Sequence, residues 1–292
     1  MRRPTSRIAA YFVVLLATVT AGLAGTSSAQ ELDGPGHLRD RGPGIPTSMF
    51  GTYVQRGDLL IYPFFEFYLN DDMEYSPAEF GHGLDEDFRG KFRGYEGLIF
   101  LAYGVTDRLA IELEAAVIDA TLETAASDPS GTPDRIEESG LGDVEGQVRW
   151  RWTEEREGRP EVFSYFEAVA PVQREKLLIG TPDWEFKLGT GLVRGFSWGT
   201  VTLRMAGEYS VEESKLELGE YAVEYLKRLT PAWRGYVGIE GSQDEIELIT
   251  EVQWHITDFL FVKFNNAFGV TSKANDWAPE AGLMLRFPIQ KR

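Results

Sequence analysis

Hydrophobic and polar residues alternate with a period of two through most of the chain after residue 57. In one such segment, Ile111 and Leu113 alternate with Glu112 and Glu114. Successive side chains of a strand point to opposite faces, so this alternation is typical of strands with one apolar and one polar face. The sequence therefore predicts an all-β fold. The twelve predicted strands are residues 58–69, 92–103, 108–120, 141–152, 161–173, 183–195, 200–211, 219–229, 233–241, 245–256, 259–270 and 279–289.

The lengths of these segments and of their connections favour a membrane barrel. Most predicted strands have 11–13 residues, whereas strands of globular proteins have about 5–6 and a tilted strand that crosses a bilayer needs about 9–11. Gaps after the even-numbered strands have 2–8 residues, and gaps after the odd-numbered strands have up to 22. Short turns at one rim and longer loops at the other are typical of outer-membrane barrels. We therefore predict a transmembrane antiparallel β-barrel of about twelve strands over residues 58–289.

A soluble sandwich or barrel would also alternate, and the positions of the aromatic residues help to distinguish the two. A closed barrel of twelve strands is too wide to be filled by an apolar core. Aromatic side chains also occur at the ends of predicted strands on the apolar phase, as in the girdles at membrane interfaces. The alternative is that these residues cap a soluble core. The predicted girdle comprises Tyr103, Trp150, Trp152, Trp233 and Trp254 at the short-turn rim and Trp184 at the other rim.

The first 29 residues have the three parts of a secretory signal peptide. Three arginines precede the apolar run Ile8–Leu16, and Ser27, Ser28 and Ala29 form a small-residue cleavage site. A membrane anchor is the alternative, but the apolar run is short for a span of about 20 residues. We expect a cleaved signal peptide over residues 1–29.

Residues 30–57 show little periodicity. They contain the turn-forming sequences Gly34-Pro35-Gly36 and Gly42-Pro43-Gly44. We expect this segment to be a flexible periplasmic leader.

Composition narrows the possible functions. The 292 residues include no cysteine, which excludes disulfides, thiolate metal sites and a cysteine nucleophile. They include 46 acidic against 29 basic residues, for a net charge of −17. Such a surface repels phosphate, so we expect no nucleic-acid partner. The sequence indicates no cofactor and no resident metal.

Two short stretches resemble a known family. Tyr103-Gly104-Val105-Thr106-Asp107-Arg108-Leu109 and the later Gly140-Leu141-Gly142-Asp143-Val144 resemble motifs of an outer-membrane transporter family linked to the meta-pathway of phenol degradation. The resemblance implies a periplasmic turn, a strand that starts at the outer rim, and insertion by the barrel assembly machinery. The usual C-terminal assembly signal ends in an aromatic residue, whereas here Phe287 is followed by five further residues.

Charged residues dominate the phase that would face the lumen. An acidic excess lining a pore would concentrate cations and repel anions. The alternative is an interlocking charge network that fills a narrow barrel and conducts little. The candidate lumen-lining residues are Glu66, Glu112, Glu114, Glu145, Arg149, Glu185, Lys187, Arg204, Glu208, Glu224, Glu247, Glu251, Lys263 and Arg286. Glu167 is placed inward in a strand of ambiguous phase, because lipid would penalise its carboxylate.

The predicted loops and histidines suggest further alternatives. The loop 70–91 is rich in carboxylates that could bind Ca²⁺ or bridge to lipid phosphates, although a solvated acidic loop is the simpler interpretation. His255 falls on the inward phase, and no Ser–His pair lies on the predicted outer face. We therefore predict no catalytic residues. The leading hypothesis is passive passage of small solutes, including hydrophobic or aromatic ones. The alternatives are a non-conducting structural or binding barrel and, less favoured, a lipid-modifying barrel enzyme.

Overall fold

A computed structural model describes residues 35–290 except 212–213 and 244. The predicted signal peptide and residues 30–34 lie outside the described residues. The barrel comprises β3 (Asp58–Tyr75), β4 (Phe88–Gly104), β5 (Leu109–Glu123), β6 (Arg135–Thr153), β7 (Glu161–Ala170), β8 (Glu185–Phe196), β9 (Gly199–Ser210), β10 (Lys215–Arg228), β11 (Trp233–Ser242), β12 (Glu245–Thr257), β13 (Leu260–Gly269) and β14 (Ala278–Pro288). Within the described part of the chain, no helix is long and apolar enough to cross a membrane.

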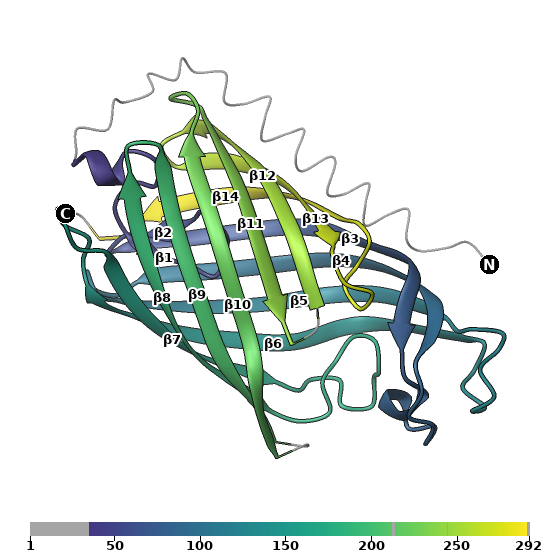
Figure 1. The fold of residues 1–292 in the computed structure, drawn as a ribbon. Coiled ribbons are helices and arrows are strands. Elements are labelled where there is room, and N and C mark those ends of the chain that lie inside the picture. The colour runs from purple at the N-terminus through teal and green to yellow at the C-terminus, as the bar shows by residue number, and fades with distance from the viewer. Residues whose placement is uncertain (1–34, 212–213, 244, 291–292) are drawn as a thin grey trace. The chain divides into compact units, whose positions relative to one another are not determined.

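Every barrel strand pairs antiparallel with its neighbours in the chain, and β14 pairs with β3 to close the barrel (Figure 1). The closing register sets Ala281 opposite Phe65 and Glu280 opposite Glu66. Closure leaves no strand edge unpaired, which a wall surrounded by lipid requires because lipid offers no hydrogen bonds. The predicted twelve-strand antiparallel barrel is confirmed.

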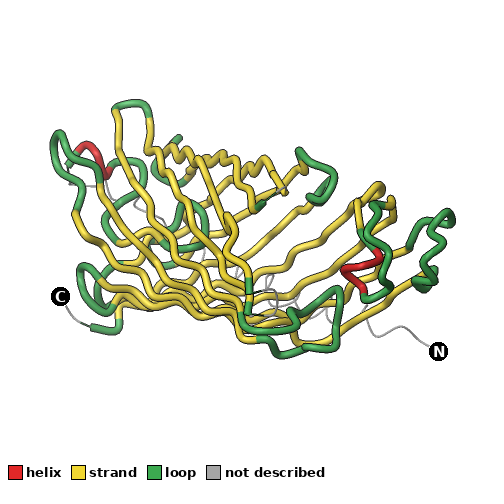
Figure 2. Tube along the Cα trace, turned by 60° about the horizontal axis from the view of Figure 1, so that its bottom comes forward, coloured by secondary structure: helices red, strands yellow, loops and turns green. Residues whose placement is uncertain are grey.

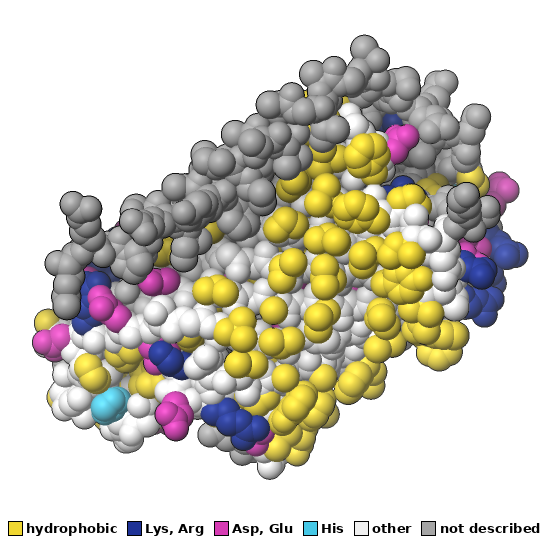
Figure 3. All heavy atoms as spheres, turned by 180° about the vertical axis from the view of Figure 1, so that it is seen from behind, with side chains coloured by type: hydrophobic (Ala, Val, Ile, Leu, Met, Phe, Trp, Pro, Cys, Tyr) yellow, Lys and Arg dark blue, Asp and Glu magenta, His cyan; other side chains and the backbone are white. Residues whose placement is uncertain are grey.

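The two faces of the wall differ in polarity. On the outer face, Ile99, Ile111 and Leu113 are each 45–48% exposed. Figure 3 shows apolar side chains across the middle of one side of the wall, with charged side chains gathered toward the two ends. A belt of this kind is unfavourable in water and suits the hydrocarbon core of a bilayer. The alternation of the sequence therefore separates a lipid-facing wall from a polar interior.

Strand ends differ from the prediction at the long-loop rim. There β3 continues to Tyr75, and β6 begins at Arg135 rather than at residue 141. These extensions carry polar residues on both faces, so the alternation that marks a bilayer-spanning strand is lost. Ion pairs between neighbouring strands support them, as between Asp71 and Arg93 at 3.0 Å. The acidic loop expected over 70–91 is thus reduced to residues 76–87 with the short 3₁₀ helix η2 (Pro77–Phe80).

The described part of the expected leader, residues 35–57, has defined structure. It contains the 3₁₀ helix η1 (Gly36–Leu38) and a small antiparallel sheet of β1 (Ile45–Pro46) and β2 (Tyr53–Val54). Figure 2 shows the two 3₁₀ helices at opposite ends of the barrel. The flexible leader expected over residues 30–57 remains a prediction, and these short elements within it are not evident from the sequence. The hairpin of β1 and β2 has too few residues for a recognisable alternation, and its stabilising partners lie on the barrel strands.

The apolar core joins this hairpin to the inside of the wall. Ile45 and Val54 are buried with Leu60, Phe64 and Phe100, which project inward from β3 and β4. Two smaller apolar clusters lie on other strands, around Tyr236 and around Tyr165, so apolar and charged groups share the interior.

Candidate functional site: the barrel interior

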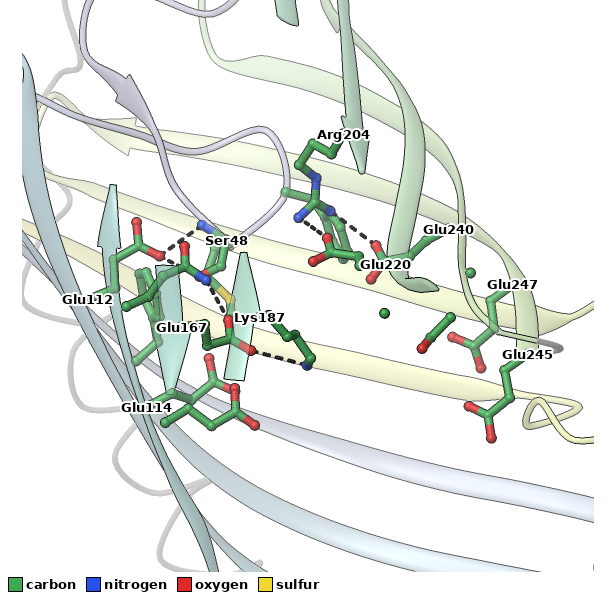
Figure 4. A pocket seen from close by; sticks show the side chains of 18 of the residues that line it. Ser48, Glu112, Glu114, Glu167, Lys187, Arg204, Glu220, Glu240, Glu245 and Glu247 are labelled. Carbon is green, nitrogen blue, oxygen red and sulfur yellow. Dashed lines mark hydrogen bonds and ion pairs between the residues drawn. The ribbon is translucent and has the colours of Figure 1, made fainter. Parts of the chain in front are cut away.

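The barrel interior contains a cavity of about 320 Å³, and most of the charged residues that line it are carboxylates (Figure 4). Ser48, Met49 and Phe50, at the tip of the β1–β2 hairpin, form one side of it. Two cations, Lys187 and Arg204, also line the cavity. Its acidic residues are Glu112, Glu114, Glu145, Glu167, Glu220, Glu240, Glu245 and Glu247.

Glu112 connects the hairpin to the wall. Its Oε2 accepts hydrogen bonds from the Ser48 hydroxyl at 2.6 Å and from the Ser48 backbone amide at 3.0 Å. Its Oε1 lies 3.2 Å from Nε of Arg149, a side chain with no exposed surface. Arg149 in turn donates to the Pro46 carbonyl at 3.1 Å. A buried carboxylate and a buried guanidinium compensate each other's desolvation here.

Lys187 and Arg204 each join several carboxylates. The Lys187 ammonium lies 3.1 Å from Glu167 and 3.8 Å from Glu208. Arg204 Nε donates to Glu224 at 2.6 Å, and its Nη2 donates to Glu240 at 3.2 Å. Arg204 also pairs with Glu220. Each cation thus faces more than one acid, so these groups keep a local negative charge.

Glu114 and Glu145 stand opposite each other in the β5–β6 register. Within the described residues neither forms an ion pair. Glu247, on β12, lines the opposite side of the cavity. Figure 4 shows the Glu114 and Glu247 side chains directed into the cavity. These carboxylates are therefore available to a solute.

Other predicted lumen residues are engaged deeper in the interior or at the rims. Lys263 pairs with Glu251 at 3.0 Å. Glu66 accepts a hydrogen bond from Tyr68 at 2.9 Å. At the short-turn rim, Arg286 pairs with Asp58 at 2.6 Å. Glu185, at the start of β8, shares the inward phase of Lys187.

Residues of the expected leader form an ion cluster at the short-turn end. Arg41 lies 2.9 Å from Glu161 and 3.3 Å from Glu155, and all three side chains are almost completely buried. The guanidinium also lies 5.0 Å from the centroid of the Tyr53 ring. Burial raises the pKa of Tyr53 to about 12, although the positive charge of Arg41 acts in the opposite direction.

Sequence reasoning missed the roles of Arg41, Ser48 and Phe50. Their segment lacks periodicity, and their partners lie up to 213 positions away along the chain. Their partners are the buried charged residues Glu161, Glu112 and Lys263. Only the three-dimensional structure shows that residues of the leader supply these contacts.

The predicted girdle residues lie on the outer wall or at its rim. Trp233 and Trp254 are register partners, and their rings stack with centroids 5.7 Å apart. Trp150 and Trp152 meet edge to face, and Trp152 donates to Ser164 at 3.0 Å. Tyr103, at the same rim, is half-buried on β4. At the other rim Trp184 stacks on Phe186.

Groups for other chemistry are sparse in the described part of the chain. It contains no group of three or more His, Asp or Glu residues placed to hold a metal ion. The inward-facing His255 stacks on Phe261 at 4.5 Å, and its Nε2 lies 3.3 Å from the Gln253 amide oxygen. These neighbours explain His255 as part of the interior packing.

Comparisons with known proteins identify the fold. No family model and no curated protein matches the sequence. The COG4313 outer membrane channel from Pseudomonas putida F1 has a similar structure, with a TM-score of 0.59 and 12% identity over 83% of this chain and 100% of that chain.

Weaker likenesses include two further barrels. The toluene transporter TbuX from Ralstonia pickettii has a TM-score of 0.41 and 9% identity, over 80% of this chain and 90% of that chain. The translocator domain of autotransporter NalP from Neisseria meningitidis has a TM-score of 0.45 and 9% identity, over 97% of each chain. The match to the COG4313 channel and the closed barrel show the fold of an outer-membrane β-barrel, which with its apolar outer wall locates the protein in the outer membrane.

Proposed function

We propose that the protein is an outer-membrane channel for passive passage of small solutes and that its lumen favours cations. The observation that carries this proposal is the internal cavity, whose eight carboxylates exceed its two cations. Charges of one sign along a pore raise the local concentration of ions of the opposite sign. A membrane barrel that surrounds such a cavity has both parts of a selective pore.

The proposal includes solutes that carry an aromatic or other apolar group. Met49, Phe50 and Phe100 contribute apolar surface to the same cavity as the carboxylates. A positively charged solute with a small apolar part would therefore find both kinds of contact. Membership of the phenol-degradation transporter family belongs to this proposal and is supported by the motifs at Tyr103–Leu109 and Gly140–Val144. The proposal also includes a signal peptide that is cleaved on export and insertion of the barrel by the barrel assembly machinery.

A non-conducting barrel is the second candidate, and one observation favours it. Residues 44–57 lie inside the barrel, where they contact many of its strands. The acidic extensions at the outer rim would then serve an external partner. We place it second because Glu114 and Glu145 form no ion pair within the described residues, and Lys187, which attracts Glu145, pairs with Glu167.

Ion selectivity tests the proposal. The refolded protein is placed in a planar bilayer with a potassium chloride gradient, and the reversal potential is measured. Discrete current steps with a reversal potential on the cation side are expected. Anion selectivity, or an absence of steps from every folded variant described below, would contradict the proposed function.

A further inference from the structure

The segment 41–57 crosses the interior and touches strands on all sides of the barrel. On one side, Arg151 of β6 donates to the Gly44 carbonyl at 2.8 Å, and Glu112 of β5 holds Ser48. On the other, Lys263 of β13 donates to the Phe50 carbonyl at 3.1 Å. Figure 1 shows β1 and β2 inside the barrel.

The remaining contacts complete this circuit of the wall. The Phe50 ring stacks on Tyr236 of β11 with centroids 5.4 Å apart, and Arg204 of β9 lies 5.3 Å from its centroid. The Gly57 amide donates to the Gly104 carbonyl of β4 at 2.7 Å. A segment with partners on opposite walls obstructs the passage between them. It lies toward the short-turn rim, which in outer-membrane barrels faces the periplasm.

We propose that residues 41–57 form a gate, which closes the lumen on the periplasmic side of the acidic cavity and leaves its place when the channel opens. This inference rests on the proposed channel function. It explains how one chain can contain both an acidic cavity and an obstructed interior.

The segment is held by polar contacts, which water can replace, and by the packing of Ile45 and Val54 in the apolar core. Several of the polar contacts join backbone carbonyls of the segment to long side chains of the wall, as with Arg149 and Lys263. The hairpin pairs with itself through Ile45–Val54 and Pro46–Tyr53. Its isolated backbone bridge to the wall joins Arg56 to Gly104. Its own pairing can therefore persist while its contacts with the wall are exchanged for hydration.

Glycines and a buried ion cluster mark the two ends of the moving part. Gly44 has a φ of 131° and Gly57 a φ of 77°, in the left-handed region that favours glycine. A Cβ at Gly44 would lie 2.8 Å from the Val54 carbonyl oxygen. Arg41, the first residue of the segment, joins it to Glu155 and Glu161. We assign Arg41 as the latch that holds the gate closed.

The first arm of the test fixes the gate in place. The chain lacks cysteine, so the double variant Ser48→Cys, Glu112→Cys has a unique pair of thiols. A short bridging reagent such as dibromobimane, which fluoresces when both thiols have reacted, links the segment to β5. Current steps are expected before bridging and should be lost afterwards. Ser48→Cys alone, treated with the same reagent, is the control for modification without a link.

The second arm releases the latch. Arg41→Gln removes the cation that the segment contributes to this cluster and leaves the wall residues Arg151 and Arg194 beside Glu161 and Glu155. Its open probability should exceed that of the wild type about tenfold or more, because breaking a buried ion pair is strongly unfavourable. Arg89→Gln is the matched control, since Arg89 pairs with Glu74 at 2.7 Å at the opposite rim. Folding of each variant is checked by heat-modifiable migration on a gel.

The outcomes separate the gate from the channel. If the unbridged proteins conduct and bridging changes nothing, or if Arg41→Gln behaves like Arg89→Gln, the gate is wrong and the channel stands. If wild type and Arg41→Gln both fold and neither conducts, the gate and the proposed function are both wrong. Loss of current on bridging together with the gain in Arg41→Gln supports the gate.

Discussion

The hydroxyl of Ser48 lies 2.6 Å from Oε2 of Glu112, so a residue of the N-terminal segment caps a carboxylate of the barrel wall. The same carboxylate faces Arg149 at 3.2 Å. Glu112 therefore belongs to the hairpin contact as much as to the cavity. This arrangement couples the cavity to a segment that lies inside the barrel but is not part of its wall.

Replacing Ser48 by Ala should loosen the hairpin. The substitution removes one hydrogen bond to a charged acceptor, which contributes about 1.5–3 kcal/mol. Hydrogen exchange of the amides in β1 and β2 should become faster, while exchange in β5 should not change. Ser130→Ala, which removes a hydroxyl from the exposed β5–β6 loop, is the control. Equal protection of the hairpin in wild type and Ser48→Ala would show that this contact does not hold it.

Neutralising Glu114 and Glu145 together should lower cation preference. Both line the cavity, and within the described residues neither forms an ion pair, although Lys187 attracts Glu145. Glu→Gln at the two positions therefore removes charge without breaking an ion pair. The reversal potential in a salt gradient should move toward zero. Glu123→Gln with Glu137→Gln is the matched double control, because these acids pair with Arg135 at the outer rim. An equal shift in both doubles would show that the cavity does not set selectivity.

Leu113→Arg should impair assembly of the barrel. Leu113 is 48% exposed on the outer wall, and an arginine on the lipid face near midplane costs about 2–4 kcal/mol. Ile111→Arg should cost less, because Ile111 lies nearer the short-turn rim, where the guanidinium can reach the interface. Unfolding of each variant in urea from lipid vesicles measures its loss of unfolding free energy relative to wild type. The reverse order would show that the membrane band is placed at the wrong depth.

Asn266→Leu should stabilise the protein. Asn266 shares the outer phase of β13 with Phe264 and Phe268, and within the described residues neither its amide nitrogen nor its oxygen has a hydrogen-bond partner. Such a group costs about 1–3 kcal/mol, so its replacement by an apolar residue should raise the free energy of unfolding. Asn265→Leu is the control, because Asn265 faces inward and donates to Glu280 at 2.7 Å. This control should be destabilising.

Alkaline pH should open the gate through Tyr53. Its pKa is raised to about 12 in the closed state, whereas a phenol in water ionises near 10. The neutral phenol therefore favours the closed state fully below about pH 10, and this contribution is lost as pH rises toward 12. Open probability should rise over this interval in wild type and less in Tyr53→Phe. Identical pH profiles would remove Tyr53 from the gate.

The sequence predicts the barrel well because every strand that crosses a bilayer must alternate apolar residues toward the lipid with polar residues toward the interior. All twelve predicted segments correspond to barrel strands, and the inward placement of Glu167 agrees with its contact to Lys187. This alternation is not required of the parts of a strand that extend beyond the bilayer. There β6 begins six residues earlier than predicted, because water tolerates polar residues on both faces.

The hairpin could not be predicted from its own residues. Two pairs of residues form its sheet, and Arg149 and Lys263 stabilise it through its carbonyl groups. A backbone carbonyl is present at every position, so such contacts leave no pattern in the sequence. The alternation identifies the acidic residues that face inward. Which of them form ion pairs depends on residues of other strands, so the sequence does not show it.

The most direct test of the central claim is the reversal potential of single channels under a potassium chloride gradient, measured for Arg41→Gln beside wild type. Discrete steps are expected, more frequent in Arg41→Gln, with the same cation-selective reversal potential in both. Anion-selective steps, or two folded proteins that never conduct, would contradict it.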